Sequence, residues 1–343
     1  MNTQLNPSRI LETATAFWPS KVLLTAVELR LFTLLANSKK RASEIASALE
    51  IHPVRAVDFL DCLVALGFLE REGVGDQALY SNGSDADFFL DRNKPSYIGG
   101  MPEMFNQRLF GFWDGLTDAL RTGEAQNETK AGGPPIFEAL YADATKLEEF
   151  LGAMAGIQTG NFLALAKGFD WSRYRRVVDV GGANGHLCRI LAAEHPHLSL
   201  VSWDLPPVAP IATRENERAG LADRIEVQQG DFFEDSLPGA DVIVMGNVLH
   251  DWNEQGKRML IQKAHDALTS GGCLIAVENV IDDERRQNAF GLMMSLNMLI
   301  EFGAEGGFDY TGQQFDQWCR QAGFSSTELM SLAGPASAAI AYR

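Results

Sequence analysis

Three acidic residues accompany apolar, strand-like runs in the second half of the chain. Asp179 lies in RVVDV, just before a glycine-rich turn, Asp204 ends LSLVSWD, and Asp231 follows IEVQQG. Because the carboxyl ends of parallel strands meet at one edge of a sheet, we expect these carboxylates to line one crevice. Asp204 suits the two hydroxyls of a ribose, and Asp231 with Phe232 suits an adenine amino group and ring. These residues therefore predict a site for a nucleoside-containing ligand.

The glycine-rich turn at 181–185 argues against a dinucleotide as that ligand. A dinucleotide fingerprint needs glycines at three positions, so that a pyrophosphate can lie on backbone N–H groups, but Ala183 and His186 occupy the second and third of them. A carboxylate at Asp179 would also repel a pyrophosphate and attract positive charge. S-adenosylmethionine has a sulfonium and an ammonium and no phosphate. We therefore expect S-adenosylmethionine as the cofactor.

His250 is the candidate for acid–base chemistry. It comes shortly after the apolar run Val242–Met245, at the carboxyl end of a predicted parallel strand, where open α/β sheets bind their ligands. Glu278 ends the next such run. A carboxylate bonded to one imidazole nitrogen leaves the other free to take a proton from an acceptor hydroxyl, so we expect His250 as base and Glu278 as its orienting partner. The Met-rich apolar helix at 290–302 would form an adaptable acceptor wall.

Alternating strands and helices must position these residues. From Arg176 onward, strand-like and helical runs alternate, which predicts an α/β fold with a doubly wound parallel sheet. Two closing runs, 327–332 and 337–342, are joined by so few residues that they can pair only antiparallel. That ending is typical of a methyltransferase sheet rather than of an ordinary nucleotide-binding fold.

The N-terminal part is predicted to be mostly helical. Apolar residues recur at helical spacing from 7 to 37, with a break at Pro19. A helix-turn-helix pattern at 42–66, followed by strand-like runs at 68–71 and 78–80, predicts a winged helix. Its second helix has no basic cluster, so we expect it to serve packing or dimerisation rather than DNA binding. Surplus apolar surface on the first helices predicts a homodimer.

The intervening residues predict a connecting region. An aromatic, Met-rich helical stretch, a polar loop at 122–135 and a second helical stretch at 136–167 follow one another. We therefore expect a winged-helix dimerisation domain at 1–95, a helical connecting region at 96–170 and a cofactor-binding domain at 171–343.

Composition excludes several classes of partner. The 343 residues include 29 basic and 45 acidic ones, a net charge of −16, which disfavours nucleic acid and anionic membranes as partners. No apolar run reaches membrane-spanning length, and the first residues lack the pattern of a signal peptide. The four cysteines lie far apart without ligand spacing, so no metal site is expected. A cytoplasmic protein is expected.

Five ordered motifs point to a family: VVDVGGANG, WDLPPV, GDFF, LHDW and GGFDYTGQQF. They resemble those of the S-adenosylmethionine-dependent small-molecule O-methyltransferases of the acetylserotonin, caffeic acid and hydroxyneurosporene type, over nearly the whole chain. The resemblance implies a class I methyltransferase fold and a base at His250 flanked by Glu278 and Asp309. Caffeic-acid-type enzymes usually have glutamate where this chain has Asp309. Plant members have a lysine where this chain has Gly246, so an adenine contact there would come from backbone or be absent.

The motifs and the resemblance together imply two sets of binding residues. The methyl donor is expected to be held by Asp179, Gly181, Gly182, Asp204, Leu205, Asp231, Phe232 and Gly246. The acceptor is expected to contact Phe17, Tyr141, Met154, Met294, Asn297 and Met298.

The accepting atom stays open between alternatives. O-methylation of a small hydroxylated acceptor is expected first. The segments 17–29 and 288–303 are similar to bacterial branches that include 4-methylthio-2-hydroxybutyrate S-methyltransferases of dimethylsulfoniopropionate synthesis. A thioether has no proton to lose, so His250 would there position the acceptor while Glu278 and Asp309 favour the developing sulfonium. A third alternative, from another class, is a ligand-binding transcriptional regulator without catalysis.

Overall fold

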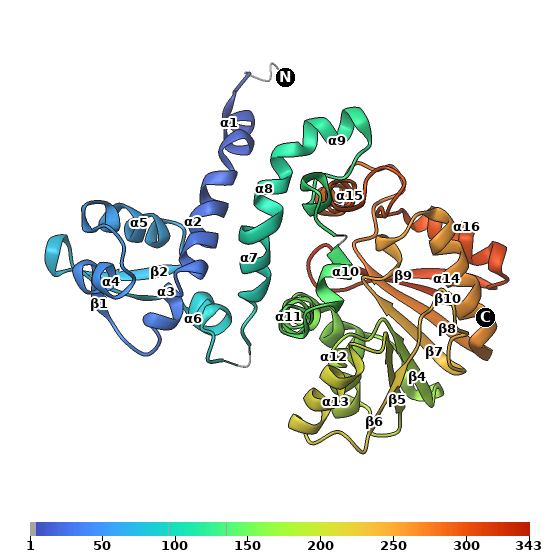
Figure 1. Ribbon diagram of the computed structural model, residues 1–343. Coiled ribbons are helices and arrows are strands. Elements are labelled where there is room, and N and C mark those ends of the chain that lie inside the picture. Colours follow the sequence, from blue (N-terminus) through green and yellow to red (C-terminus); the bar gives the residue numbers. More distant parts are fainter. Residues whose placement is uncertain (1–4, 95, 135) are drawn as a thin grey trace. The chain divides into compact units, whose positions relative to one another are not determined.

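The structure, a computed structural model, describes residues 5–94, 96–134 and 136–343. It divides into two compact units, Met1–Gly111 and Phe112–Arg343 (Figure 1). The predicted connecting region at 96–170 falls partly in each unit. The domain boundaries that the sequence predicted, after residues 95 and 170, stay predictions.

The N-terminal unit begins with three helices, α1 (Ser8–Thr15), α2 (Phe17–Glu28) and the single turn α3 (Leu31–Leu34). The first break lies at Ala16, so the prediction of a break at Pro19 was wrong. Pro19 belongs to the first turn of α2, where the backbone N–H of a helix has no intrahelical partner and proline is tolerated.

A winged helix follows, as predicted. Helices α4 (Ala42–Ala48) and α5 (Pro53–Ala65) precede a small antiparallel sheet in the order β1-β3-β2. Its strands are β1 (Lys40–Arg41), β2 (Leu69–Glu72) and β3 (Leu79–Asn82), with the short turn η1 (Gly75–Gln77) between the last two. The carboxylate of Asp61 on α5 accepts from the Tyr80 hydroxyl at 2.8 Å and pairs with Arg71 at 2.7 Å, which ties α5 to the wing. Helix α6 (Ser84–Leu90), helix α7 (Gly100–Met104) and the π-helical turn η2 (Phe105–Leu109) complete the unit.

The first two helices of this unit keep large apolar side chains exposed. None of the residues of α1 is buried, and Ile10, Phe17 and Trp18 are 70%, 56% and 61% exposed. The inward face of α2, by contrast, joins a core that includes Leu31, Phe32 and Leu60. The outward apolar surface therefore exceeds what the unit itself covers.

The C-terminal unit is built on a seven-stranded sheet in the order β6-β5-β4-β7-β8-β10-β9. All pairings from β6 to β8 are parallel, whereas β10 is antiparallel to both β8 and β9, as the short connection predicted. The strands are β4 (Arg176–Val180), β5 (Ser199–Asp204), β6 (Ile225–Gln229), β7 (Ala240–Gly246), β8 (Leu268–Glu278), β9 (Ser326–Ser331) and β10 (Ser337–Tyr342). This is the predicted doubly wound sheet with a methyltransferase ending.

Helices cover both faces of this sheet (Figure 1). One core contains Val178 and Val180 of β4 with side chains of α14 and α16, and the other contains Val177 with side chains of α11 and α12. Alternate residues of a strand point to opposite faces, so β4 must be apolar on both. The helices are α8 (Phe110–Phe112, across the unit boundary), α9 (Leu116–Thr122), α10 (Ile136–Tyr141), α11 (Ala144–Gly168), α12 (His186–Glu194), α13 (Ala209–Arg218), α14 (Glu254–Ala267), α15 (Ala289–Phe302) and α16 (Gly312–Ala322). Short turns are η3 (Trp113–Gly115), η4 (Glu128–Ala131), η5 (Trp171–Arg173) and η6 (Leu249–Asp251).

The helical stretch predicted at 136–167 is two helices, α10 and α11. Asp143 separates them, and its side chain accepts from the backbone N–H groups of Thr145 and Lys146 at the start of α11. Asp is a favoured N-cap residue, which explains why the second helix begins there. Across the described part of the chain, no helix is long and apolar enough to cross a membrane.

Candidate active site

The glycine-rich turn after β4 leaves no room for side chains. Gly181 has a φ of +71°, and a Cβ there would lie 2.7 Å from a methyl carbon of Val248. A Cβ on Gly182 would lie 2.6 Å from the Ser202 hydroxyl oxygen. Both backbone N–H groups donate to the Trp203 carbonyl, which joins the turn to the end of β5. The turn is thus a close-packed cradle of the kind expected around a ligand that lies against backbone.

Asp204, at the end of β5, is held by backbone donors. One carboxylate oxygen accepts from the N–H of Ala183 at 2.8 Å and the other from the N–H of Leu205 at 2.7 Å. Burial nevertheless raises the pKa of Asp204 to about 6. The carboxylate is therefore oriented by the turn itself, and its remaining lone pairs can accept from ribose hydroxyls.

Asp179 is buried beneath the same turn. Burial, with the neighbouring Asp204 carboxylate, raises the pKa of Asp179 to about 7. The hydroxyl of Ser202, a buried neighbour in the adjacent strand, has no hydrogen-bond partner among the described residues. A buried carboxylate with a raised pKa gains most from a nearby positive charge, which fits the charged groups of S-adenosylmethionine.

Asp231 and the two phenylalanines after it follow β6, at the same edge of the sheet where β4 and β5 end. The Asp231 carboxylate accepts from the N–H of Phe233 at 2.8 Å, and the ammonium of Lys263 on α14 donates to the carbonyl oxygens of Phe232 and Phe233 at 2.7 and 3.1 Å. The ring of Trp252, in the LHDW motif, packs edge-on against Phe233 at 4.5 Å between centroids. This contact links the GDFF and LHDW motifs.

Gly246, at the end of β7, lies against an aromatic ring rather than a lysine side chain. A Cβ on Gly246 would lie 3.2 Å from two ring carbons of Phe162 on α11. The space that a side chain at 246 would need is therefore taken by Phe162. Contact of the donor with Gly246 stays a prediction, and this residue could offer only its backbone.

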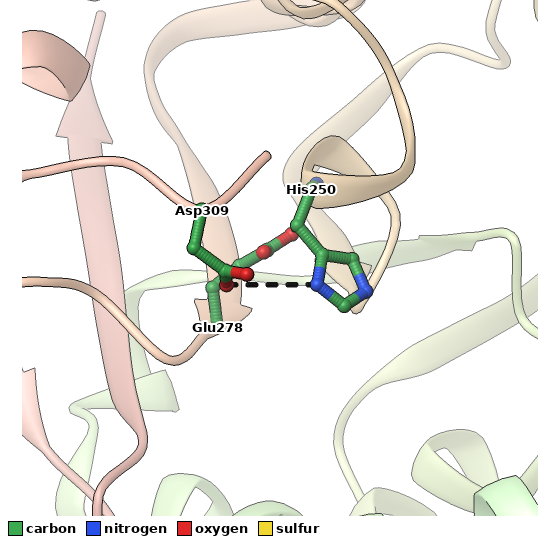
Figure 2. A group of neighbouring side chains, drawn as sticks. All are labelled: His250, Glu278 and Asp309. Carbon is green, nitrogen blue, oxygen red and sulfur yellow. Dashed lines mark hydrogen bonds and ion pairs between the residues drawn. The ribbon is translucent and has the colours of Figure 1, made fainter. Parts of the chain in front are cut away.

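His250 lies in the 3₁₀ turn η6, immediately after β7. The turn is followed by α14, whose first residues are capped by the Asn253 side chain accepting from the Gly256 N–H at 3.0 Å. The imidazole is buried, and its Nδ1 lies 3.6 Å from a carboxylate oxygen of Asp309, the contact drawn in Figure 2. Its Nε2 lies 3.4 Å from the Asp251 carboxylate. The shorter side chain of Asp309 thus leaves a gap longer than an ordinary hydrogen bond.

Glu278 holds His250 through the backbone and not through the ring. One Glu278 carboxylate oxygen accepts from the N–H groups of Leu249 at 2.9 Å and His250 at 3.3 Å. The sequence predicted a Glu278 bond to the imidazole, whereas the structure pairs the imidazole with Asp309 and Asp251. The difference arises because η6 turns its first N–H groups toward the end of β8, where a carboxylate caps them.

Four ionisable groups form one buried set, which we call the His250 cluster: His250, Asp251, Glu278 and Asp309. Burial by itself would lower the pKa of His250, but the carboxylates of Glu278, Asp251 and Asp309 outweigh burial and raise that pKa to about 10. Burial raises the pKa of Glu278 and of Asp251, and the nearby imidazole lowers both. The cluster therefore favours an imidazole that carries a proton.

Six buried polar atoms around this cluster have no hydrogen-bond partner within the described residues. They are His250 Nδ1, Glu278 Oε2, both carboxylate oxygens of Asp309, the Tyr310 hydroxyl and Trp252 Nε1. Buried polar groups are normally paired, so such a concentration marks the place where a polar ligand group is expected to bind. The arrangement suits transfer of a proton to or from that group.

A metal ion would also find suitable ligand atoms here. One ligand atom each from His250, Glu278 and Asp309 lies within 4.8 Å of the others. The ammonium of Lys257 on α14, however, faces the same carboxylates and already supplies a positive charge. We therefore interpret the cluster as an acid–base site rather than a metal centre.

The residues predicted to contact the acceptor lie at different places. Asn297 and Met298 are buried on α15, and the Asn297 amide oxygen accepts from the Trp113 indole N–H at 3.0 Å. Tyr141 packs in a small apolar cluster with Leu205, next to the donor crevice. Met154 and Met294 are half-buried on α11 and α15, and Phe17 belongs to the N-terminal unit. Contact of these residues with the acceptor stays a prediction.

Sequence reasoning missed Lys257, which is fully buried beside the cluster. A signal for it was present, because Lys257 recurs at helical spacing with Leu260, Ile261 and Ala264, the residues that α14 buries. A lysine in an apolar stripe needs a partner, and the partners here come from other strands and turns that the spacing does not reveal.

Comparison with known families matches both units. The O-methyltransferase domain family matches residues 113–325, and the O-methyltransferase dimerisation domain family matches residues 11–92. The first match covers more than half of the chain, and the second spans the winged helix.

Individual relatives and a solved structure agree with these matches. The chain is 41% identical to the tetracenomycin polyketide synthesis 8-O-methyl transferase TcmO of Streptomyces glaucescens, covering 97% of this chain and 96% of the relative. It is 38% identical to the N,N-dimethyltransferase OxyT of Streptomyces rimosus, covering 80% and 78%. The crystal structure of human N-acetylserotonin methyltransferase in complex with S-adenosylmethionine is similar with a TM-score of 0.90 and 26% identity, covering 100% of this chain and 99% of that one.

Proposed function

Because the chain belongs to the O-methyltransferase family and is an S-adenosylmethionine-dependent methyltransferase, we propose that it methylates a hydroxyl of a small aromatic acceptor, with His250 as general base. The observation that carries this proposal is the placement of His250. Its imidazole is buried at the end of β7, faces two carboxylates, and is held through its backbone by Glu278. That geometry suits a base whose protonated form is stabilised.

The donor set follows from the crevice edge. Asp204 would accept from the ribose hydroxyls, Asp231 would accept from the adenine amino group, and Asp179 would face positive charge from beneath the glycine turn. Gly181 and Gly182 would let the donor lie against backbone. S-adenosylmethionine, when bound, supplies an electrophilic methyl carbon bonded to a sulfonium sulfur.

His250 has one task in the transfer. An acceptor hydroxyl must lose its proton as its oxygen gains the methyl group, and an imidazole nitrogen of His250 would accept that proton. The imidazolium that forms is stabilised by Asp309 and Asp251, whose carboxylates face its two nitrogens. Glu278 keeps η6 in place throughout by accepting from its N–H groups.

A phenolic hydroxyl fits this base better than an aliphatic one. A phenol, with a pKa of about 10 as in tyrosine, is far more acidic than an aliphatic alcohol, so it loses its proton more readily to an imidazole whose pKa the surrounding carboxylates raise. The apolar α15 would contact an aromatic ring through methionines. The relative TcmO, by its name, acts in polyketide synthesis, which supports a polyketide as the acceptor.

The comparisons favour oxygen over sulfur as the accepting atom. TcmO is named an O-methyl transferase, and the family that matches the C-terminal unit is an O-methyltransferase family. A second candidate is an amine, because OxyT is named an N,N-dimethyltransferase and is 38% identical. An amine that attacks as the free base also releases a proton, so His250 would have the same role.

Incubation of the full chain with methyl-labelled S-adenosylmethionine and a panel of acceptors tests the proposal. The panel contains polycyclic phenols, matched aromatic amines and thioether acids, and mass spectrometry identifies the atom that gains the label. We expect label on phenolic oxygen. Label on nitrogen alone would support the second candidate, whereas label on sulfur alone would overturn the proposal. In that last case Asp309→Asn should lower turnover more than His250→Ala, because charge and not proton transfer would dominate.

The dimerisation domain is proposed to join two copies of this chain through α1 and α2. Support comes from the exposed Ile10, Phe17 and Trp18 and from the match to the dimerisation family. Sedimentation of a Phe17→Ser/Trp18→Ser double variant should show a weaker dimer than that of Val74→Ser, an exposed apolar residue of the wing. An unchanged dimer would contradict the proposal. A cytoplasmic location suits the four free cysteines and stays a prediction.

A further inference from the structure

Lys257 is the most deeply buried charged residue beside the His250 cluster. Its side chain is 0% exposed, although lysine is almost never fully buried without a partner. Its ammonium donates to the backbone carbonyl of Trp252, two residues after His250. It also lies 3.7 Å from the centre of the Phe308 ring, the residue immediately before Asp309. One side chain from α14 thus contacts two of the three chain segments that carry the cluster, the one with His250 and the one with Asp309.

The charges around Lys257 come from four elements. Asp251 belongs to η6, Glu278 to β8, Asp309 to the segment before α16, and Glu254 to the first turn of α14 itself. Burial lowers the pKa of Lys257 to about 8, and these carboxylates oppose only part of that shift. In return, the ammonium lowers the pKa of Glu278 and Asp251 against the effect of burial. Without Lys257, the cluster would hold more buried negative charge than His250 alone can balance.

We propose that Lys257 is a positioning residue for methyl transfer, which keeps the Glu278 and Asp251 carboxylates ionised and fastens the His250 segment to the Asp309 segment. The inference rests on the proposed role of His250 as base. Ionised Glu278 matters because a charged oxygen accepts the Leu249 and His250 N–H groups more strongly than a neutral one. Lys257 touches neither the imidazole nor, by this proposal, the acceptor.

Three variants separate charge from packing. Lys257→Met removes the ammonium and keeps the length of the side chain. Lys257→Gln also removes the charge but keeps an N–H donor for the Trp252 carbonyl, and it serves if the methionine variant does not fold. Lys257→Arg keeps the charge. Arg258→Met is the matched control, because Arg258 is the next residue of α14 and pairs only with the surface residues Glu254 and Gln321 in the described structure.

Infrared spectroscopy at pH 8 gives a readout that a merely structural role would not change. We expect a carbonyl band of a protonated carboxyl group in Lys257→Met and Lys257→Gln, absent from wild type, Lys257→Arg and Arg258→Met. The band should weaken or vanish when Glu278→Gln is added. Turnover should fall about tenfold or more in the two uncharged variants, with donor affinity within about twofold of wild type and partial recovery in Lys257→Arg.

The outcomes are distinct. Lack of the band in both uncharged variants would overturn the proposal, and so would turnover losses that merely follow losses in melting temperature and are equal in Lys257→Arg. A failure of the proposed function looks different, because His250→Ala would then keep normal turnover while the band in the Lys257 variants would still report on the carboxylates.

Discussion

The carboxylates of the donor side and those of the His250 cluster differ in how they are held by hydrogen bonds. On the donor side, Asp204 accepts from the backbone N–H groups of Ala183 in the glycine turn and of Leu205, and Asp231 accepts from the N–H of Phe233. In the His250 cluster, by contrast, both oxygens of Asp309 and one nitrogen of His250 are buried without a hydrogen-bond partner in the described structure. The donor side is organised by backbone N–H groups at the strand ends, whereas the imidazole of the cluster faces side chains that come from separate segments of the chain.

This difference suits the donor side to binding the cofactor and the His250 cluster to proton transfer. Carboxylates fixed by adjacent N–H groups cost little to orient, so they can bind a ligand without rearrangement. Buried groups that lack partners are costly in the free protein, and they gain most when a ligand supplies the missing contact. We therefore expect substitutions on the donor side to change affinity and substitutions in the cluster to change turnover.

The largest effect is expected from His250→Ala. Removal of a general base should lower turnover by about 10²–10⁴-fold, because the hydroxyl proton then has no acceptor in place. Donor affinity, measured by calorimetry, should stay nearly unchanged. His52→Ala, an exposed histidine of the N-terminal unit, is the control and should keep wild-type turnover. Normal turnover in the His250 variant would show that the cluster does not act on turnover.

Asp204→Ala should act on affinity. Loss of a charged hydrogen-bond acceptor for the ribose is expected to weaken donor binding by about 1.5–3 kcal/mol, a factor of about 10 to 150 in Kd. Asp223→Ala, which removes an exposed carboxylate from the same unit, should leave the Kd unchanged. Calorimetry that finds equal affinities for both variants would show that Asp204 does not hold the donor.

Donor affinity and kcat/KM for the acceptor should depend on pH in different ways. When protonated, Asp179, with a pKa of about 7, loses its attraction for a cationic donor, and Asp204, with a pKa of about 6, accepts less strongly from the ribose hydroxyls. Donor affinity should therefore rise about tenfold from pH 5.5 to pH 8 and then level off. His250 must be neutral to accept a proton, so kcat/KM for the acceptor should continue to rise toward pH 10. Asp179→Asn should flatten only the affinity curve. A single shared pH profile would contradict the separation.

The smallest effect is expected from Gly246→Ala. The added Cβ would lie 3.2 Å from the Phe162 ring, which must shift by a few tenths of an ångström. We expect donor affinity to fall by a factor of about five, equivalent to about 1 kcal/mol of overpacking. Gly239→Ala is the control, because its Cβ would meet nothing closer than 3.8 Å. Equal affinities in the two variants would show that Phe162 does not shape the donor crevice.

The donor side was easier to predict from the sequence than the His250 cluster. The positions of the glycine turn, Asp204 and Asp231 were predictable because each lies at or just after the end of an apolar strand, and parallel strands end at one edge of a sheet. The winged helix and the antiparallel closing strands were predictable because local periodicity and short connections determine them. The pairing of His250 with Asp309 and the burial of Lys257 were not derivable from spacing. Those contacts depend on how η6, β8 and the segment before α16 meet, which is set by packing of the whole sheet.

Helix α14 carries both side chains that anchor the crevice edge. Lys257 donates to the Trp252 carbonyl, and Lys263, six residues later, donates to the Phe232 and Phe233 carbonyls. Six residues of helix span about 9 Å, so one rigid rod sets the spacing between the donor loop and the His250 turn. A residue inserted between the two lysines would rotate one anchor by about 100° relative to the other. An insertion or deletion between Lys257 and Lys263 would therefore displace one of these two anchors from its carbonyl partners.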